Sequence, residues 1–141
     1  MKHLTSILLM ALILSLTACS KETPIPATPP TSETITQLDE GVWPVNEYTA
    51  GLPVPSGTVQ WAMLDHAHPN CSIHLTDCSE TAYTHYMSLL QQAGYSVVEE
   101  VSEPINEQGD RSTNTLLTNG EKGLSISYLS NAFTIYIAFE Q

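Results

Sequence analysis

Basic side chains are scarce in this chain of 141 residues, which has four lysines and arginines against 15 aspartates and glutamates. The formal net charge is −11. Proteins that bind nucleic acid through its phosphates need clustered lysine and arginine. The sequence has no such cluster, which excludes nucleic acid as a partner. The same acidity disfavours anionic partners and electrostatic attachment to an anionic bilayer, but it allows cationic partners.

Long apolar runs are also scarce. The longest one, from Ile7 to Leu16, is too short to form a stable membrane span. It follows the basic Lys2, and this combination is typical of a removable signal peptide. We therefore expect residues 1–18 to be absent from the mature protein.

Cysteine is the third rare residue, and the first of the three ends the apolar run. The sequence Leu16-Thr17-Ala18-Cys19 resembles the lipobox of bacterial lipoproteins. The resemblance implies that cleavage leaves Cys19 as the N-terminal residue and that fatty acids such as palmitate anchor it to the membrane. Ser20, rather than Asp, follows it. This implies the periplasmic face of the outer membrane in a Gram-negative cell, and otherwise the outer face of the cell membrane. The alternative is an ordinary secretory signal with an incidental cysteine.

Residues 19–41 are rich in Pro, Ser, Thr and Glu and contain almost nothing to bury. Prolines favour extended polyproline II structure, so we expect a disordered tether between the lipid and a folded domain. The remaining residues, 42–141, have the size of one small domain.

The pattern of apolar residues in that domain predicts an α+β fold. Alternation with a period of two predicts strands, and a capped 3.6-residue stripe predicts one helix. In Thr58–Asp65, the alternation places Val59, Trp61 and Met63 on one face. We expect a two-layer arrangement, with one helix packed on a mostly antiparallel sheet of about five to six strands, in the order β-β-α-β-β-β-β. The predicted strands are 58–65, 72–76, 95–101, 113–118, 124–128 and 133–139, and the predicted helix is 78–93.

The helix has recognisable start and stop signals. Asp77 and Glu80 have the spacing of a capping box, and Gly94 can take the left-handed conformation that ends a helix. Tyr95 would then close back on Leu90. The side chains on one stripe are expected in the core: Tyr83, Tyr86, Met87 and Leu90.

The domain opens with Trp43-Pro44 and then Leu52-Pro53-Val54-Pro55. Together with the strand pair, the helix ending in Gly-Tyr and the closing meander, this arrangement resembles small uncharacterised bacterial lipoprotein domains. The similarity spans most of residues 42–141. It implies no catalytic role for any residue.

Histidines and cysteines gather between residues 66 and 85. The alternation of a strand places His74 on the face opposite Cys71. That leaves His66, His68 and Cys71 as a possible zinc or copper site, without the second ligand pair of a structural zinc motif. The alternative is solvated histidines in a polar loop.

With Cys19 acylated, Cys71 and Cys78 remain, and an exported protein meets an oxidising compartment. If residues 71–78 form a looped excursion, the two cysteines form a disulfide. If they form a strand, more than 20 Å separates them, and the thiols are free or pair between molecules. Burial of Ile73 and Leu75 favours the strand. Cys78 would then start the helix, where a lowered pKa could make it reactive. The alternative, which is the commoner outcome for such a cysteine, is an inert, half-buried thiol.

No catalytic motif such as G-x-S-x-G occurs, so the sequence favours a protein that is not an enzyme. Our leading hypothesis is a lipid-anchored envelope domain that binds a protein or another envelope component. It would present its solvated sheet face or the acidic loop 103–111. The alternative is a metal-handling or thiol-redox lipoprotein that uses His66, His68, Cys71 and Cys78.

Overall fold

The computed structural model describes residues 34–141, which lie in one compact unit. The predicted signal peptide, the predicted lipidation site Cys19 and the predicted tether up to residue 33 lie outside the described residues. The α+β class is confirmed, with one antiparallel sheet and a single helix in the described part of the chain. The elements are β1 (Ile35–Leu38), β2 (Thr58–Asp65), β3 (Asn70–Thr76), α1 (Glu80–Gln92), β4 (Ser96–Pro104), β5 (Arg111–Thr118), β6 (Lys122–Leu129) and β7 (Ala132–Phe139).

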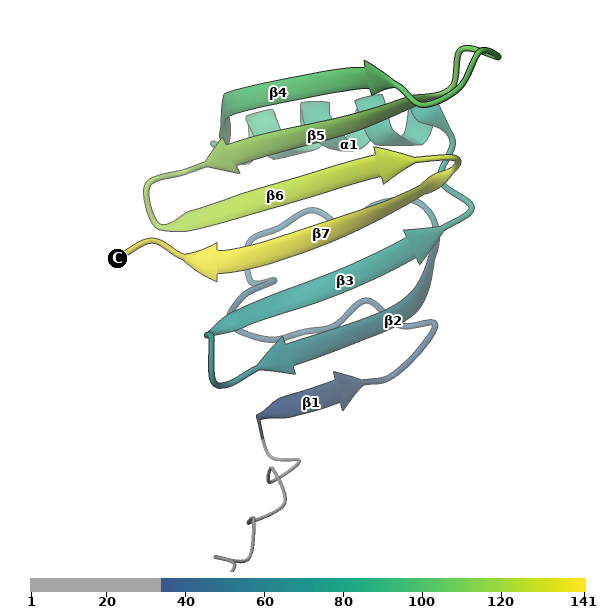
Figure 1. Cartoon of the computed structure of the whole chain (residues 1–141). Helices are drawn as coiled ribbons and strands as arrows, with labels where there is room; N and C mark the ends of the chain where they lie inside the picture. Colours follow the sequence, from purple (N-terminus) through teal and green to yellow (C-terminus); the bar gives the residue numbers. More distant parts are fainter. Residues whose placement is uncertain (1–33) are drawn as a thin grey trace, which may run out of the picture. The chain divides into compact units, whose positions relative to one another are not determined.

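The seven strands form one sheet in the order β1-β2-β3-β7-β6-β5-β4, and every neighbouring pair is antiparallel (Figure 1). The prediction of five to six strands was therefore wrong. The additional strand, β1, lies in the stretch predicted to be tether and pairs with β2 from Ile35 opposite Asp65 to Leu38 opposite Ala62. Leu38 packs against the core from this edge. A four-residue strand is too short to show a period of two beside a proline-rich segment.

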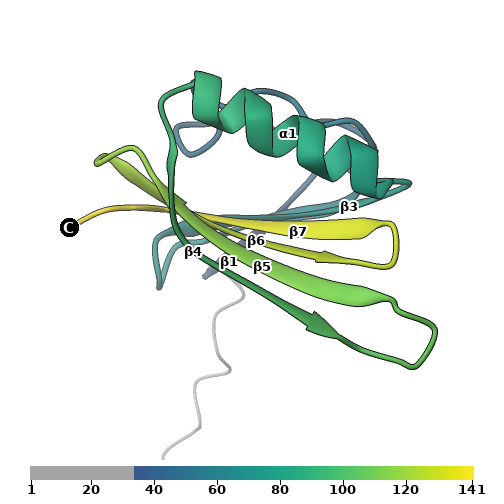
Figure 2. The ribbon, with the colours of Figure 1, turned by 90° about the horizontal axis from the view of Figure 1, so that it is seen from above.

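Helix α1 lies over one face of the sheet, which we call the inner face (Figure 2). Residues 42–57 cover part of the same face, so the helix is not the whole of the second layer. From this segment, Tyr48 and Leu52 are buried in the core. The sheet supplies the alternating side chains of its central strands to the same core: Ile73, Leu75, Leu124, Ile126, Phe133, Ile135 and Ile137.

The N-terminus of α1 differs from the prediction. Ser79 is the N-cap, and its hydroxyl accepts a hydrogen bond of 3.2 Å from the Ala82 N–H. Asp77 has a φ of 59°, a left-handed conformation that an N-cap does not adopt. The helix therefore begins at Glu80 rather than at Cys78.

The C-terminus of α1 confirms the prediction. Gly94 has a φ of 93°, and the N–H of Tyr95 donates to the Leu90 carbonyl over 3.0 Å, as in a Schellman motif. The predicted stripe of Tyr83, Tyr86, Met87 and Leu90 is buried. Within residues 34–141, no helix has the length and apolarity that a membrane span requires.

The predicted facing of β2 was wrong in its second half. Its pairing with β3 shifts between Val59 and Trp61, as it does at a β-bulge. Val59 and Ala62 are consequently buried, while Trp61 and Met63 lie on the outer face and are half-buried. There Trp61 stacks on His74, with ring centroids 5.4 Å apart. The predicted outward direction of His74 on β3 is confirmed.

Candidate functional site

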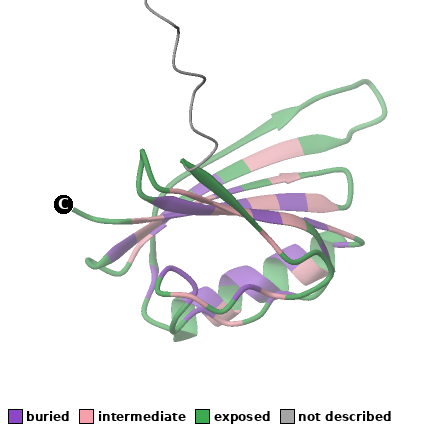
Figure 3. Cartoon of the chain, turned by 90° about the horizontal axis from the view of Figure 1, so that it is seen from below, coloured by how far each residue is buried: buried purple, intermediate pink, exposed green. Residues whose placement is uncertain are grey.

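The inner face of the sheet changes from apolar to polar along β5. Leu117 and Thr115 are buried, Thr113 is half-buried and Arg111 is exposed. All nine residues of the neighbouring β4 are exposed (Figure 3). Helix α1 thus leaves this end of the sheet uncovered, and polar side chains occupy positions that would otherwise belong to the core.

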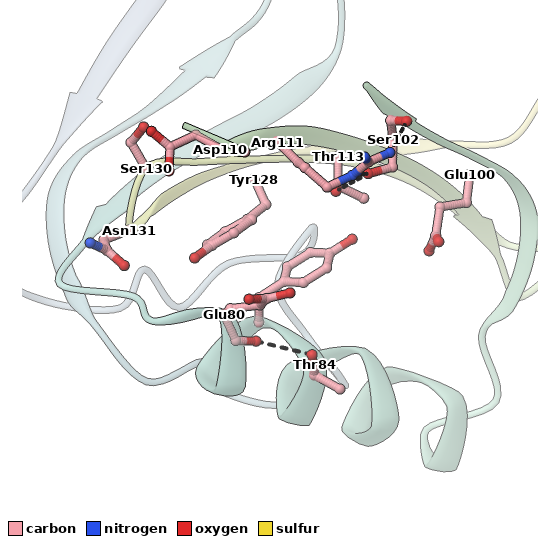
Figure 4. Close-up of a pocket in the computed structure, with 12 residues that line it drawn as sticks. Glu80, Thr84, Glu100, Ser102, Asp110, Arg111, Thr113, Tyr128, Ser130 and Asn131 are labelled. Atoms are coloured by element: carbon pink, nitrogen blue, oxygen red, sulfur yellow. Dashed lines mark hydrogen bonds between the residues drawn. The ribbon is translucent and has the colours of Figure 1, made fainter. Parts of the chain in front are cut away.

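A cavity of about 580 Å³ opens at this end, between the first turns of α1 and the inner faces of β4 and β5 (Figure 4). We call it the α1–β4 pocket. The turn between β6 and β7 closes one side. Its lining is polar and aromatic: Glu80, Tyr83, Thr84, Glu100, Ser102, Gly109, Asp110, Arg111, Thr113, Tyr128, Ser130 and Asn131. Its size is within the range of small-molecule binding sites.

A series of hydrogen bonds connects the helix to Glu100 through the floor of the pocket. The hydroxyls of Tyr83 and Thr115 lie 2.7 Å apart, and the Thr115 hydroxyl donates to the Glu100 carboxylate over 3.3 Å. Because Thr115 has a single proton to donate, Tyr83 must be the donor to Thr115. The series fixes the direction of the Glu100 carboxylate.

Two tyrosines form an aromatic wall. The rings of Tyr83 and Tyr128 stack with centroids 4.9 Å apart and an interplanar angle of 22°. Burial raises the pKa of both hydroxyls, and the charges of Glu100 beside Tyr83 and Glu80 beside Tyr128 raise these pKa values further. Both hydroxyls therefore stay protonated at neutral pH and serve as hydrogen-bond donors rather than as bases.

The charged groups of the pocket are unequal in number, with three carboxylates and one guanidinium. Arg111 is held by Ser102, to whose hydroxyl its Nε donates over 2.9 Å and to whose carbonyl its Nη2 donates over 2.6 Å. The contact between His68 and Asp65, which is an ion pair only when the imidazole is protonated, is the only contact of this kind in residues 34–141. The carboxylates of Glu80, Glu100 and Asp110 consequently have no cationic partner within the described part of the chain.

The structure does not bring the predicted metal ligands together. His66 hydrogen-bonds to the Thr36 hydroxyl over 2.9 Å, and Nδ1 of the exposed His68 lies 3.3 Å from the Asp65 carboxylate. Cys71 is on the inner face of β3, fully buried in the core. Among residues 34–141, no three His, Cys, Asp or Glu side chains are grouped to hold a metal ion.

Of the two alternatives for the cysteines, the structure has the strand. Both Cys71 and Cys78 are buried and free; Cys71 is the second residue of β3, and Cys78 lies two residues beyond the end of that strand. The prediction that Cys78 has a lowered pKa was wrong. Burial and the neighbouring Asp77 raise the pKa of its thiol to about 11, and burial also raises the pKa of Cys71. Cys78 precedes the helix cap, and its Sγ lies 3.3 Å from the carbonyl oxygens of both Ser56 and Thr76, which compete for its single proton.

The predicted acidic loop 103–111 is shorter than expected, since β4 extends to Pro104 and β5 begins at Arg111. Asp110 and Arg111 from this segment line the α1–β4 pocket. The predicted solvated sheet face carries two separate polar pairs: His74 and Thr134 lie 2.9 Å apart, and Ser127 donates to Asn114 over 2.6 Å.

Sequence reasoning did not identify the pocket. It placed Tyr83 in the core and Glu80 in a cap, and it gave Glu100 no role. The signal that could have found the site is the pair Thr113 and Thr115, which occupy inward positions of β5 although their partners on β6 are aromatic or apolar. No family model, curated protein or solved structure matches this chain.

Proposed function

We propose that this chain is a lipid-anchored binding domain of a bacterial cell envelope, which holds a partner and does not catalyse a reaction. The α1–β4 pocket carries this proposal. It is a cavity of ligand size, lined by fixed polar groups, at the one end of the inner face that α1 leaves open.

The two tyrosines of the pocket and the two cysteines of the domain are unsuited to act as bases or nucleophiles at neutral pH. The pKa values of Tyr83 and Tyr128 are raised, as are those of Cys71 and Cys78. A nucleophile or general base needs a pKa at or below the working pH. These side chains instead keep their protons at neutral pH.

The anchoring half of the proposal depends on Leu16-Thr17-Ala18-Cys19 and on the location that Ser20 implies. The membrane is reached through the acyl chains of Cys19, and the partner is an envelope protein or another envelope component. The proline-rich segment that follows would let the domain reach such a partner at a distance from the bilayer.

Two measurements in cells test the proposal. Cells that express the full-length chain are fed an alkyne-tagged palmitate, and we expect the label on the wild-type chain and not on Cys19→Ala. A photocrosslinker at Thr84, on the rim of the pocket, should then capture a specific neighbour, whereas one at Ser125 on the outer face should not. Unlabelled wild-type chain would overturn the anchor, and no neighbour specific to position 84 would overturn the binding role.

A further inference from the structure

We propose that the α1–β4 pocket binds an organic ammonium group, carried either by a free amine or by a lysine side chain. This inference rests on the proposed binding function and names the chemistry of the ligand. The charge, the aromatic wall and the geometry of the pocket support an ammonium ligand.

The charge of the pocket calls for a cation. Glu80 on α1, Glu100 on β4 and Asp110 on the hairpin approach the cavity from three separate elements, and Figure 4 shows Glu80 and Glu100 facing it from opposite sides. None of the three has an ion-pair partner among residues 34–141. The three carboxylates do not group closely enough to hold one ion together. An ammonium group would therefore pair with one of them, and we assign it to Glu100, which the Tyr83–Thr115 hydrogen bonds orient.

The aromatic wall suits the same ligand. A cation that lies over the face of a tyrosine ring is attracted by its quadrupole, and the alkyl chain next to the ammonium packs on the ring. Of the stacked pair, Tyr83 is buried and Tyr128 is half-buried, so Tyr128 presents the accessible part of this surface to the pocket. The effects of Glu100 on the pKa of Tyr83 and of Glu80 on the pKa of Tyr128 agree with this proximity.

The exposed Glu100 carboxylate is oriented in the free protein by one long hydrogen bond, of 3.3 Å, from Thr115. The Tyr83–Thr115–Glu100 hydrogen bonds orient it, and Thr115 is fully buried. A group that is already ordered loses little conformational entropy on binding. We therefore expect Glu100 to contribute more to affinity than Asp110, whose carboxylate accepts a hydrogen bond of 2.7 Å from Asn106 on the exposed hairpin.

Anions have less to bind at this end of the molecule. Ser79 already accepts from the N–H groups of Ala82 and Tyr83 at the start of α1. Arg111 donates to Ser102 rather than projecting free, and the chain as a whole has a net charge of −11.

Calorimetric titration of the full-length protein in a neutral detergent tests the inference. The probes are 1,5-diaminopentane, the blocked peptide Ala-Lys-Ala and, as the uncharged analogue, Ala-norleucine-Ala. We expect at least one of the two amines to bind and the norleucine peptide not to bind. The affinity for the amine should fall as NaCl is raised from about 50 to about 300 mM, because this change shortens the Debye length by more than half. Tighter binding of the lysine peptide would identify a protein side chain as the source of the ammonium, and tighter binding of the diamine a free amine.

Glu100→Gln should weaken amine binding about tenfold, which corresponds to about 1.4 kcal/mol. The matched control is Glu99→Gln, the same charge change one residue away on the outer face, where Glu99 pairs with the exposed Leu116. It should leave affinity within about twofold. Tyr128→Leu should weaken binding and Tyr128→Phe should not, and thermal unfolding of each variant checks that it folds.

Equal effects of Glu99→Gln and Glu100→Gln would overturn the inference, because attraction to the overall negative charge would then explain the binding. Failure of both amines would also overturn it. If the crosslinker at Thr84 still captures a neighbour in that case, the proposed binding function stands and only the ligand class is wrong.

Discussion

Lys122 is a buried cation that holds residues 42–57, the segment covering part of the inner face, against the sheet. Its side chain is 5% exposed, and Nζ donates to the carbonyls of Glu47 and Ala50, each over 2.8 Å. Nζ also lies 5.4 Å from the centroid of the Phe139 ring. The charge is thus shared between two carbonyls and an aromatic face, and residues 42–57 are held on β6.

Replacement of Lys122 by methionine is expected to destabilise the fold. Methionine keeps most of the side-chain volume but leaves the two carbonyls without their donor, which should lower the free energy of unfolding by roughly 2–4 kcal/mol. Urea denaturation followed by tryptophan fluorescence measures the change. Arg111→Met is the control, because it removes a cation from an exposed position and should cost about 1 kcal/mol or less. Equal losses for the two variants would contradict the role given to Lys122.

Helix α1 contains two buried tyrosines, and only one of their hydroxyls has a hydrogen-bond partner among the described residues. The Tyr83 hydroxyl bonds to Thr115 over 2.7 Å, whereas the Tyr86 hydroxyl has no partner among the described residues. Tyr86 stacks on Phe133 with ring centroids 5.8 Å apart, so its ring is well packed. The unfavourable feature of Tyr86 is therefore its unpaired hydroxyl and not the packing of its ring.

Tyr86→Phe should consequently leave stability unchanged or raise it by up to about 1 kcal/mol, because it removes a buried polar group that is not satisfied. Tyr83→Phe should lower stability by about 1–2 kcal/mol, because it leaves Thr115 without its donor. The two variants delete the same atom from the same helix, and thermal unfolding compares them directly. A larger loss for Tyr86→Phe than for Tyr83→Phe would contradict this assignment.

The elements that periodicity predicts well are those with a single buried face. Strand β7 alternates cleanly, and the stripe and Gly94 stop of α1 were read correctly. The errors fall where a local feature breaks the period. The bulge after Val59 reverses the facing of Trp61, and the left-handed Asp77 moves the helix start.

The pocket could not be read from the sequence because it has no local signature. Its side chains come from the start of α1, the middle of β4, the start of β5 and the end of β6. Long-range pairing of β4 with β5 and of β5 with β6 brings them together. The composition indicates only that the chain is acidic and allows cationic partners. The positions at which unpaired carboxylates lie near tyrosine rings depend on the fold.

At the scale of the whole molecule, the buried titratable groups make stability depend on pH in one direction. Burial raises the pKa of the Cys71 and Cys78 thiols and of five tyrosines: Tyr48, Tyr83, Tyr86, Tyr95 and Tyr128. In the unfolded chain these thiols lose their protons near pH 9 and the phenols near pH 10. The folded state then holds more protons than the unfolded state, so unfolding is favoured as the pH rises.

We therefore expect the free energy of unfolding to be nearly constant between about pH 7 and 8.5 and to fall steeply above about pH 9. The fall should continue toward pH 11, where Cys78 would ionise in the folded state. Added negative charge on a chain that already has a net charge of −11 acts in the same direction. Urea midpoints should drop by roughly 1 M between pH 8 and pH 10.5.

Cys78→Ala isolates the part of this decline that comes from one thiol. The variant should be less stable than the wild type at pH 7, since it leaves space beside Gly57 and removes the thiol proton for which the carbonyls of Ser56 and Thr76 compete. Between pH 9 and 10, however, its stability should fall less steeply, because it lacks a group that ionises only on unfolding. Parallel pH profiles for the two proteins would show that Cys78 does not contribute to the decline, and a wild-type profile flat to pH 10.5 would contradict the raised pKa values altogether.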